Sequence, residues 1–403
     1  MTKQSLLSRL KRPDPAPAVL LVLSVLLPAV LHLLLGTDLF GSTYYNTYTR
    51  QALAWREGLL HLPEDVPALE LAVYGGEYYV SFPPVPSLVE LPLTFLFGQN
   101  TPDMLLMVIY MAFSCESLYF AFRKETGDRI SSAGYAFFLC YASCVLPLIL
   151  NGAVWYHAQL LGFALIAGSL LLFAYDKPTG ALICFAFSVG CRPFNVVYGV
   201  LTGLLYLWRL ILLKKTFRQI VRILLPGVLG GLAVACAYGA YNAARFGNVF
   251  EFGHNYLPEF SFQGGVQFSV AHIPGNLKNF VLAMPFTFLN GGTELQLRQF
   301  GFCMFIANPT LALLLIWYVC DLIRGKNILP GAAVIVCCAA HLFLLLLHRT
   351  FGGYQFGARY TCDLILYGAV YLLLSRRKLT GAETVLYLFS LAFSIYGTLA
   401  MHL

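Results

Sequence analysis

The chain has 403 residues, of which 59% are hydrophobic and only 11% are charged. The mean hydropathy of +0.71 lies far above that of soluble proteins, so the composition excludes a soluble globular domain and favours a protein that crosses a membrane many times. The net charge is +7. Most of the basic residues lie in the segments between hydrophobic runs that membrane topology assigns to one side, so the positive charge does not indicate a nucleic-acid partner.

Hydrophobic runs alternate along the chain with short charged segments. A spanning helix needs about 20 mostly apolar residues, which predicts an all-α polytopic membrane protein with about eleven transmembrane helices. The predicted spans cover residues 17–36, 103–122, 130–150, 158–175, 179–191, 193–213, 221–243, 304–323, 328–347, 361–375 and 382–402.

The Lys and Arg residues predict the orientation, because they are retained on the cytoplasmic side of a membrane. With the N-terminus inside, most of the 26 fall on that side, and an odd number of spans places the C-terminus outside. A basic N-terminus precedes the first span, but no small-residue cleavage site follows it, so we expect an uncleaved anchor. The basic residues left on the outer face are Arg50, Arg56, Arg192, Arg245, Lys278, Arg298, Arg349 and Arg359.

This topology predicts a single integral membrane domain over residues 1–403. Its parts are a cytoplasmic N-terminus with the first span (1–36), a first outer loop (37–102), a helical bundle (103–244), a second long outer loop (245–303) and C-terminal helices (304–403).

Both long outer loops contain segments that are too short or too polar to span. Residues 44–55 have helical spacing, and residues 83–97 and 277–288 are semi-apolar runs interrupted by proline, so all three are expected to lie in the membrane interface. Residues 69–80 predict a β-hairpin, since Gly75-Gly76 separates two short β-prone arms.

The eleven cysteines lie mainly inside the apolar spans, as small buried hydrophobic residues do. A disulfide framework would instead place pairs in the outer loops. No Cys/His spacing suggests zinc, so no metal ligands are predicted.

Several segments resemble a known family, in the same order along the chain. They are "YNTYTRQALAWREGLLHL" from Tyr45, "LELAVYGGEYYVSFPPVPS" from Leu69, "SVGCRP" from Ser188, "YNAARFGNVFEFGHNYLPEF" from Tyr241 and "GGYQFGARYTCD" from Gly352. Together with the single N-terminal span, they resemble the GT-C superfamily of polytopic glycosyltransferases, which includes protein O-mannosyltransferases and the aminoarabinose transferases of lipid A. The resemblance implies a GT-C-like fold and transfer of a sugar from a polyprenyl-phosphate donor to an acceptor on the outer face.

Displacing a lipid phosphate from a sugar requires a carboxylate to take the acceptor's proton and cations to hold the departing phosphate. The resemblance places the base in the first outer loop, where Asp38 is the nearest acidic residue by position. The spacing from Ala52 to Gly58 would instead place the family's catalytic Asp near Thr43, and Glu70 is the second candidate. The choice between Asp38 and Glu70 stays open.

Outer arginines are the candidates for binding the donor phosphate, because a guanidinium binds phosphate with two hydrogen bonds and keeps its charge. Arg192 is favoured, since it ends an apolar span, although it also suits a charge that reaches the interface. Arg359 either binds the donor or pairs with Asp363, and Arg245 either binds it or pairs with Glu251 in the loop.

Further outer residues are candidates for substrate binding. Aromatic side chains suit sugar stacking and suit a membrane-interface belt equally well, and a histidine beside aromatic residues is more often a packing residue than a base. The candidates are Tyr44, Tyr79, His157, His254, Gln355 and Asp363. No cofactor is required beyond the donor, and a divalent cation stays open.

Two other functions stay open. A non-catalytic flippase or scaffold for lipid-linked sugars would bind the donor without the chemistry, whereas a secondary transporter would need ionisable residues near the midplane, where only Glu116 lies. We expect a bacterial plasma-membrane protein with a cytoplasmic N-terminus and an extracytoplasmic site. Its partners would be membrane lipids, the lipid-linked sugar and a glycan, lipid or protein acceptor.

Overall fold

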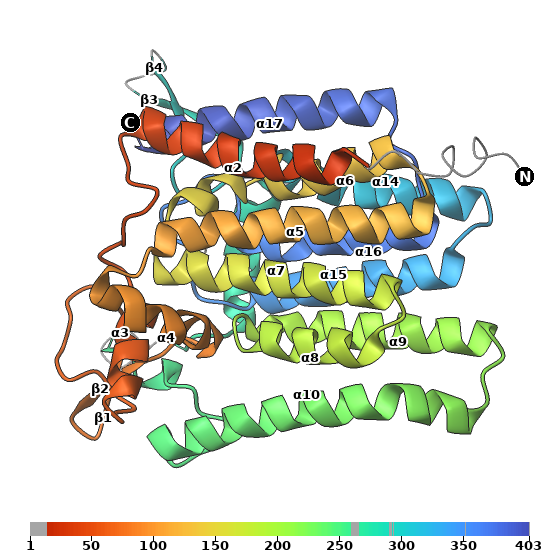
Figure 1. Cartoon of the computed structure of the whole chain (residues 1–403). Coiled ribbons are helices and arrows are strands. Elements are labelled where there is room, and N and C mark those ends of the chain that lie inside the picture. Colours follow the sequence, from red (N-terminus) through yellow and green to blue (C-terminus); the bar gives the residue numbers. More distant parts are fainter. Residues whose placement is uncertain (1–13, 259–265, 290–291, 293, 351, 403) are drawn as a thin grey trace, which may run out of the picture.

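The computed structural model describes residues 14–258, 266–289, 292, 294–350 and 352–402. It is a bundle of roughly aligned helices with most of the non-helical chain gathered at one end (Figure 1). Seven helices among the described residues are long and apolar enough to cross a membrane, counting Pro193–Asn195 with α9. They are α2 (Ala16–Leu35), α5 (Asp103–Thr126), α7 (Val154–Ala174), α9 (Val196–Leu212), α10 (Phe217–Phe246), α15 (Ile328–Leu346) and α17 (Gly381–His402).

The remaining bundle helices are shorter. They are α6 (Arg129–Tyr141), α8 (Pro178–Val189), α13 (Met304–Ala307), α14 (Pro309–Ile323) and α16 (Ile365–Ser375), with 3₁₀ turns at Leu146–Leu150, Pro193–Asn195 and Arg359–Leu364. Each of the eleven predicted spans coincides with helix, so the all-α polytopic class is confirmed. Several of these helices fall short of the predicted length because proline or a polar turn interrupts the run.

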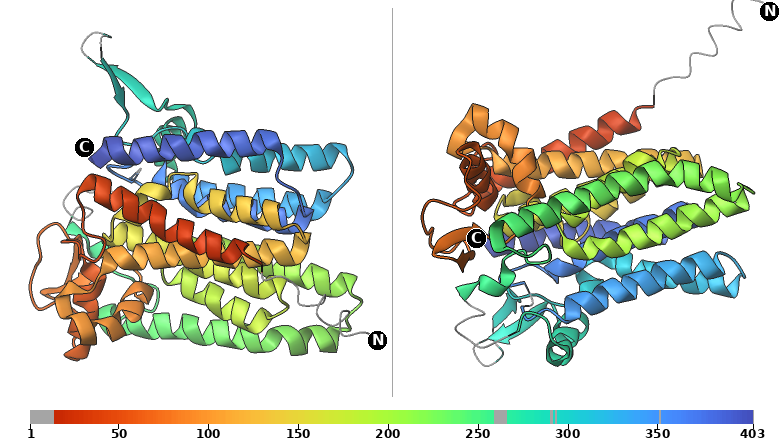
Figure 2. Two further views of the ribbon diagram at one scale, coloured as in Figure 1. Left: turned by 45° about the horizontal axis from the view of Figure 1, so that its top comes forward. Right: turned by 90° about the horizontal axis from the view of Figure 1, so that it is seen from below.

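The centre of the bundle is formed by α5 and α7 (Figure 2). Buried residues make up 83% of the apolar window of α7 but only 6% of that of α10, which lies at the margin. Two glycines let α10 approach α8. A Cβ on Gly227 would lie 2.8 Å from Leu182, and one on Gly230 would lie 2.7 Å from Ile183, so larger residues would push the helices apart.

The two ends of the bundle differ in the chain that they carry. The turns between α5 and α6, α9 and α10, and α14 and α15 lie at one end, and these turns hold many of the predicted cytoplasmic Lys and Arg (Figure 1). The opposite end carries α3 (Thr47–Arg56), α4 (Val85–Phe97) and the strands β1 (Leu71–Tyr74) and β2 (Glu77–Val80).

The first outer loop has the local structure that its sequence predicts. Two helices of less than spanning length, α3 and α4, lie where residues 44–55 and 83–97 were expected to be interfacial. The strands β1 and β2 form an antiparallel hairpin, and Gly75 and Gly76 between them have φ values of +62° and +85°, which a two-residue turn of this kind requires.

The second outer loop differs from the prediction. The expected interfacial segment 277–288 contains one short helix end, a π-helical turn and a strand. Pro285 precedes that strand, whose Phe-Thr-Phe-Leu sequence is β-prone. The elements here are η4 (His254–Tyr256), η5 (Val270–His272), α12 (Ile273–Leu277), the π-helix η6 (Lys278–Leu282) and the antiparallel strands β3 (Phe286–Leu289) and β4 (Glu294–Leu297).

Candidate functional site

A cavity of about 580 Å³ lies at the end of the bundle that carries α3 and α4. It is walled by the first outer loop, the first turn of α7, the segment that follows α8, and two later outer segments. Its polar lining is Glu70, Arg192, His254, Gln267, His348, Thr350 and Arg359, and its aromatic lining is Phe82, Trp155, Tyr156, Phe194, Phe252, Phe268, Tyr354 and Tyr360.

Glu70 lies in this cavity, immediately before β1. Its φ is +52° and that of Ala68 is +65°, a left-handed conformation that costs about 1 kcal/mol for a residue with a side chain. The fully buried Leu69 anchors the segment. The indole Nε1 of Trp155, in the first turn of α7, donates a hydrogen bond of 2.9 Å to Glu70 Oε2. The carboxylate is therefore held against the cavity wall by a strained backbone and an aromatic donor.

Arg192 also lines the cavity, but an acid neutralises it. Its Nε and Nη2 both donate to Asp363 Oδ2, at 3.0 Å and 2.8 Å, and Gln159 donates to the other carboxylate oxygen at 2.8 Å. Arg192 therefore lies in the cavity with a buried carboxylate as its partner, and its role as a phosphate ligand stays a prediction. Asp363 lies behind the lining as that partner and does not line the cavity itself.

Arg359 lines the same cavity. Asp363 pairs with Arg192 and not with Arg359. Arg359 is 5% exposed, and its guanidinium donates one hydrogen bond of 3.2 Å, from Nη2 to the carbonyl of Gly352. Among the described residues, its Nε and Nη1 have no hydrogen-bond partner. The guanidinium carbon lies 5.1 Å from the ring centre of Tyr156 and 4.9 Å from that of Tyr360. A buried cation with two spare donors is an incomplete anion site.

Gln355 fixes the position of this arginine from behind. Its Oε1 accepts a hydrogen bond of 2.7 Å from the backbone N–H of Arg359. Gly352 allows the close approach of that side chain, since a Cβ there would lie 2.9 Å from Gln355 Oε1. Gln355 therefore supports the arginine and does not line the cavity.

Two histidines add neutral polar groups to the lining. Burial lowers the pKa of His254 and that of His348 to about 4, so both rings are uncharged near neutral pH. His254 Nδ1 donates to the carbonyl of Ser81 at 2.9 Å. Arg192 is paired and the histidines are uncharged, and Glu70 and Arg359 are the other two charged side chains of the lining.

Asp38 does not reach this cavity, and the expected convergence of Asp38 with the other candidates is therefore wrong. Its side chain is exposed, and Oδ1 accepts a hydrogen bond of 2.9 Å from the backbone N–H of Phe40. This is a local turn that follows the end of α2. Thr43, the other position that the resemblance suggested, donates its backbone N–H to both carboxylate oxygens of Asp103 at 3.1 Å.

Arg245, Tyr44 and Tyr79 have structural contacts and do not line the cavity. Arg245 donates to the carbonyl of Val80 at 2.8 Å. The Tyr44 hydroxyl donates to a carbonyl of the same loop at 3.1 Å, and the Tyr79 ring packs against Phe246 with centres 5.1 Å apart.

His157 is buried behind the cavity, where its Nδ1 lies 3.2 Å from Glu90 Oε1 and its Nε2 lies 3.0 Å from the Tyr110 hydroxyl. Thr49 donates to the other oxygen of Glu90. Both side chains of the pair are 1% exposed. The pair joins α4 to α7 and does not line the cavity.

Sequence reasoning missed His348, Gln267, Thr350 and Phe252. His348 and Thr350 lie two residues apart in one segment, Gln267 lies in a second, and Phe252 lies within the motif that begins at Tyr241, so no single spacing links all four. Only the fold brings them together. Among the described residues there is no group of three or more His, Cys, Asp or Glu that could hold a metal ion.

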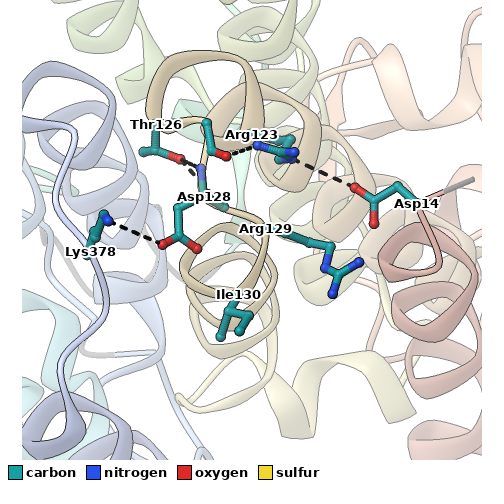
Figure 3. A pocket seen from close by; sticks show the side chains of 8 residues that line it. Asp14, Arg123, Thr126, Asp128, Arg129, Ile130 and Lys378 are labelled. Atoms are coloured by element: carbon teal, nitrogen blue, oxygen red, sulfur yellow. Dashed lines mark hydrogen bonds and ion pairs between the residues drawn. The ribbon is translucent and has the colours of Figure 1, made fainter. Parts of the chain in front are cut away.

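Two other hollows differ in chemistry from this cavity. One, of about 590 Å³, lies at the opposite end of the bundle, where Arg123 pairs with Asp14 and Lys378 pairs with Asp128 (Figure 3). Its carboxylates are thus already paired with cations. The other, of about 620 Å³, is lined mainly by apolar side chains of α3, α4, α8 and α10, and Pro84 lines it while Pro83 lines the cavity of Glu70.

No protein-family model matches this sequence, and a search of curated proteins found no match either. Solved structures do match the fold at 14% sequence identity. Two are of the oligosaccharyltransferase of Archaeoglobus fulgidus, one in the apo form and one, named AglB, in complex with an inhibitory peptide and a dolichol-phosphate. Their TM-scores are 0.45 and 0.46, and the matches cover 97% and 96% of this chain.

A third match is ArnT from Cupriavidus metallidurans bound to undecaprenyl phosphate, with a TM-score of 0.50 over 92% of this chain and 14% identity. The chain spans between 55% and 62% of the length of the three matched structures. At this identity the likeness concerns the fold alone: the chain shares its fold with ArnT, which agrees with the GT-C-like fold that the resemblance in the sequence implies.

Proposed function

We propose that this protein is a membrane glycosyltransferase that moves a sugar from a polyprenyl-phosphate donor to an acceptor hydroxyl in the cavity of Glu70 and Arg359. The observation that carries this proposal is the guanidinium of Arg359, which is buried and retains two donors without a partner. A phosphate is the common biological anion that such a fork binds with two hydrogen bonds. The undecaprenyl phosphate bound to ArnT, which shares the fold, supports the same donor class.

In the proposed reaction, the acceptor oxygen attacks the anomeric carbon of the donor sugar. The bond from that carbon to the phosphate oxygen breaks, and the phosphate leaves with the electron pair. Glu70 takes the proton of the acceptor hydroxyl, and Arg359 stabilises the charge that develops on the phosphate. The departing phosphate is a weak base, so the reaction requires no general acid.

The surroundings of the two charged residues suit the rest of the substrate. Trp155 and Tyr156 offer aromatic faces to a sugar ring, next to the carboxylate and the guanidinium respectively. The apolar hollow beyond Pro83 and Pro84 is of a kind that accepts a hydrocarbon chain. The proposed donor would thus place its phosphate at Arg359 and its lipid between α4 and α10.

The proposed location is the plasma membrane, and the charge pattern supports an orientation with the cavity on the extracytoplasmic side. A glycan, a lipid or a protein remains the acceptor class of this proposal, and the transferred sugar is a hexose or a pentose.

The test is release of the lipid carrier. The purified full chain is incubated with polyprenyl-phosphate sugars extracted from bacterial membranes and with an acceptor extract from the same cells, and free polyprenyl phosphate is measured by mass spectrometry. Release that depends on Glu70 supports the transferase. Donor binding without release, in the parent protein and with every sugar tried, would instead support a flippase or a scaffold.

A further inference from the structure

Two cysteines far apart in the sequence meet beside the candidate site. The sulfur atoms of Cys144 and Cys362 lie 3.1 Å apart, although 218 residues separate them. Cys144 follows α6, and Cys362 lies in the 3₁₀ turn Arg359–Leu364. Their exposed fractions are 0% and 1%. A separation this short puts both thiols within a small side-chain movement of bonding distance.

The contact is held by the packing of three chain segments. The backbone N–H of Cys144 lies 3.1 Å from the carbonyl of Ala307 and 3.2 Å from Asn308 Oδ1. The amide of Asn308 donates in turn to Thr361 Oγ1 at 2.8 Å. Hydrogen bonds to Ala307 and Asn308 thus fix the position of Cys144, and the bond from Asn308 to Thr361 fixes the residue next to Cys362.

A glycine makes this approach possible. Gly357 has a φ of +67°, and a Cβ on it would lie 2.5 Å from the Cβ of Ala307 and 3.0 Å from that of Cys144. Any side chain at this position would separate the segment that carries Cys362 from the end of α6.

We propose that Cys144 and Cys362 are joined by a disulfide. In its formation, the thiolate of one cysteine attacks a disulfide of an oxidant, such as a thiol–disulfide oxidoreductase or oxidised glutathione, and expels one of its sulfurs as a thiol. The thiolate of the other cysteine then attacks this mixed disulfide, forms the Cys144–Cys362 bond and expels the second oxidant sulfur. The two cysteines are oxidised, and the oxidant is reduced to two thiols.

The place of the pair fits this chemistry. Cys144 and Cys362 lie towards the end of the bundle that carries the cavity, which the charge pattern assigns to the extracytoplasmic side, where disulfides persist. Exchange takes place before the segments close over the sulfurs, because both are shielded in the folded chain. The same shielding makes the bond slow to reduce without unfolding.

The disulfide would tie the outer end of α6 to the turn that carries Arg359 and Asp363. It would hold the guanidinium and its neighbouring ion pair against the bundle. Formation of the bond does not depend on sugar transfer, so it stands or falls separately from the proposed function.

Mass spectrometry of the full-length protein tests the inference. The chain is purified from membranes in detergent without reductant, unfolded in the presence of N-ethylmaleimide and digested. We expect a peptide pair linked through Cys144 and Cys362 and loss of alkylation at these two positions. Cys236, exposed on α10, is the internal control and should be alkylated completely.

Two further samples secure the assignment. Reduction after unfolding should release the linked pair and add two alkylation sites, whereas Cys144→Ser should free Cys362 for alkylation. Complete alkylation of both cysteines in the unreduced parent protein would overturn the inference. This readout is covalent and needs no activity, so it remains decisive even if a variant is produced poorly.

Discussion

Asp363 accepts both hydrogen bonds of Arg192 on a single oxygen, at 3.0 Å and 2.8 Å, and has no ion pair with Arg359 on its own 3₁₀ turn. Arg359, which lies four residues before Asp363 in the sequence, is thus not its partner in the fold, and Arg192 is. In the part of the chain that the structure describes, no carboxylate forms an ion pair with Arg359. The cavity therefore contains a guanidinium, that of Arg359, which has no carboxylate partner among the described residues and whose position is fixed by the protein.

Arg359→Gln should weaken binding of polyprenyl phosphate by about tenfold or more, because hydrogen bonds to a charged group contribute about 1.5–3 kcal/mol each. The dissociation constant is measured with the purified parent and variant in detergent. Arg56→Gln is the matched control, since Arg56 is also an outer arginine but donates to the carbonyl of Thr94 away from the cavity. Equal affinities in all three proteins would contradict the phosphate site.

Glu70→Gln should lower turnover by about 100-fold or more while donor affinity is kept, because the amide cannot take the acceptor's proton and has nearly the same shape. Asp38→Asn should turn over like the parent, since Asp38 makes a local turn outside the cavity. Single-turnover transfer with bound donor measures both. The opposite result, in which only Asp38→Asn loses turnover, would identify Asp38 as the base.

Glu90 should make the stability of the protein depend on pH. Burial raises the pKa of this carboxyl from 4.5 to about 8, so the folded state favours the protonated form. The stabilising contribution is complete below about pH 4.5 and is lost as the pH rises through about 8. Thermal unfolding in detergent across this range should show the Tm falling with pH.

The matched variant for this effect is Glu90→Gln, which keeps the shape and cannot ionise. Its Tm should vary less with pH than that of the parent, and it should be the more stable protein at the alkaline end. Parallel curves for the two proteins would show that the carboxyl buried beside His157 does not set the slope.

Labelling from one side of the membrane should confirm the orientation. Glu64→Cys places a thiol on an exposed position of the first outer loop, and Lys214→Cys places one in the exposed turn between α9 and α10. In intact cells, with Cys236 replaced by Ala, an impermeant maleimide should label the first and spare the second. Labelling of Lys214→Cys alone would put the cavity on the cytoplasmic face.

The helices and the first hairpin could be predicted because their signals are local. Apolar length sets a spanning helix, and two adjacent glycines set the turn between β1 and β2. The second hairpin was missed because β3 and β4 lie in a stretch whose apolar residues suit a short helix equally well.

The pairing of charges could not be predicted for a different reason. Arg192 and Asp363 are 171 residues apart, and only the packing of the bundle decides that Asp363 faces Arg192 and not Arg359. Asp38 was predicted to lie near the site because it follows the first span closely. In the structure its carboxylate accepts a hydrogen bond from the backbone N–H of Phe40 in a local turn outside the cavity. Glu70 was harder to choose from the sequence, because no residue pattern indicates the left-handed backbone conformation that it adopts.

The length of α10 has a mechanical consequence. Its 30 residues extend about 45 Å, whereas the hydrocarbon core of a bilayer is about 30 Å thick. A tilt of this marginal helix would match it to the membrane around it. At its outer end Arg245 holds the carbonyl of Val80, and the hydroxyl of the next residue, Ser81, holds the carbonyl of Glu70. A change of bilayer thickness that re-tilts α10 would reach the backbone of Glu70 through these two hydrogen bonds, so the lipid composition of the membrane would act on the site from outside the cavity.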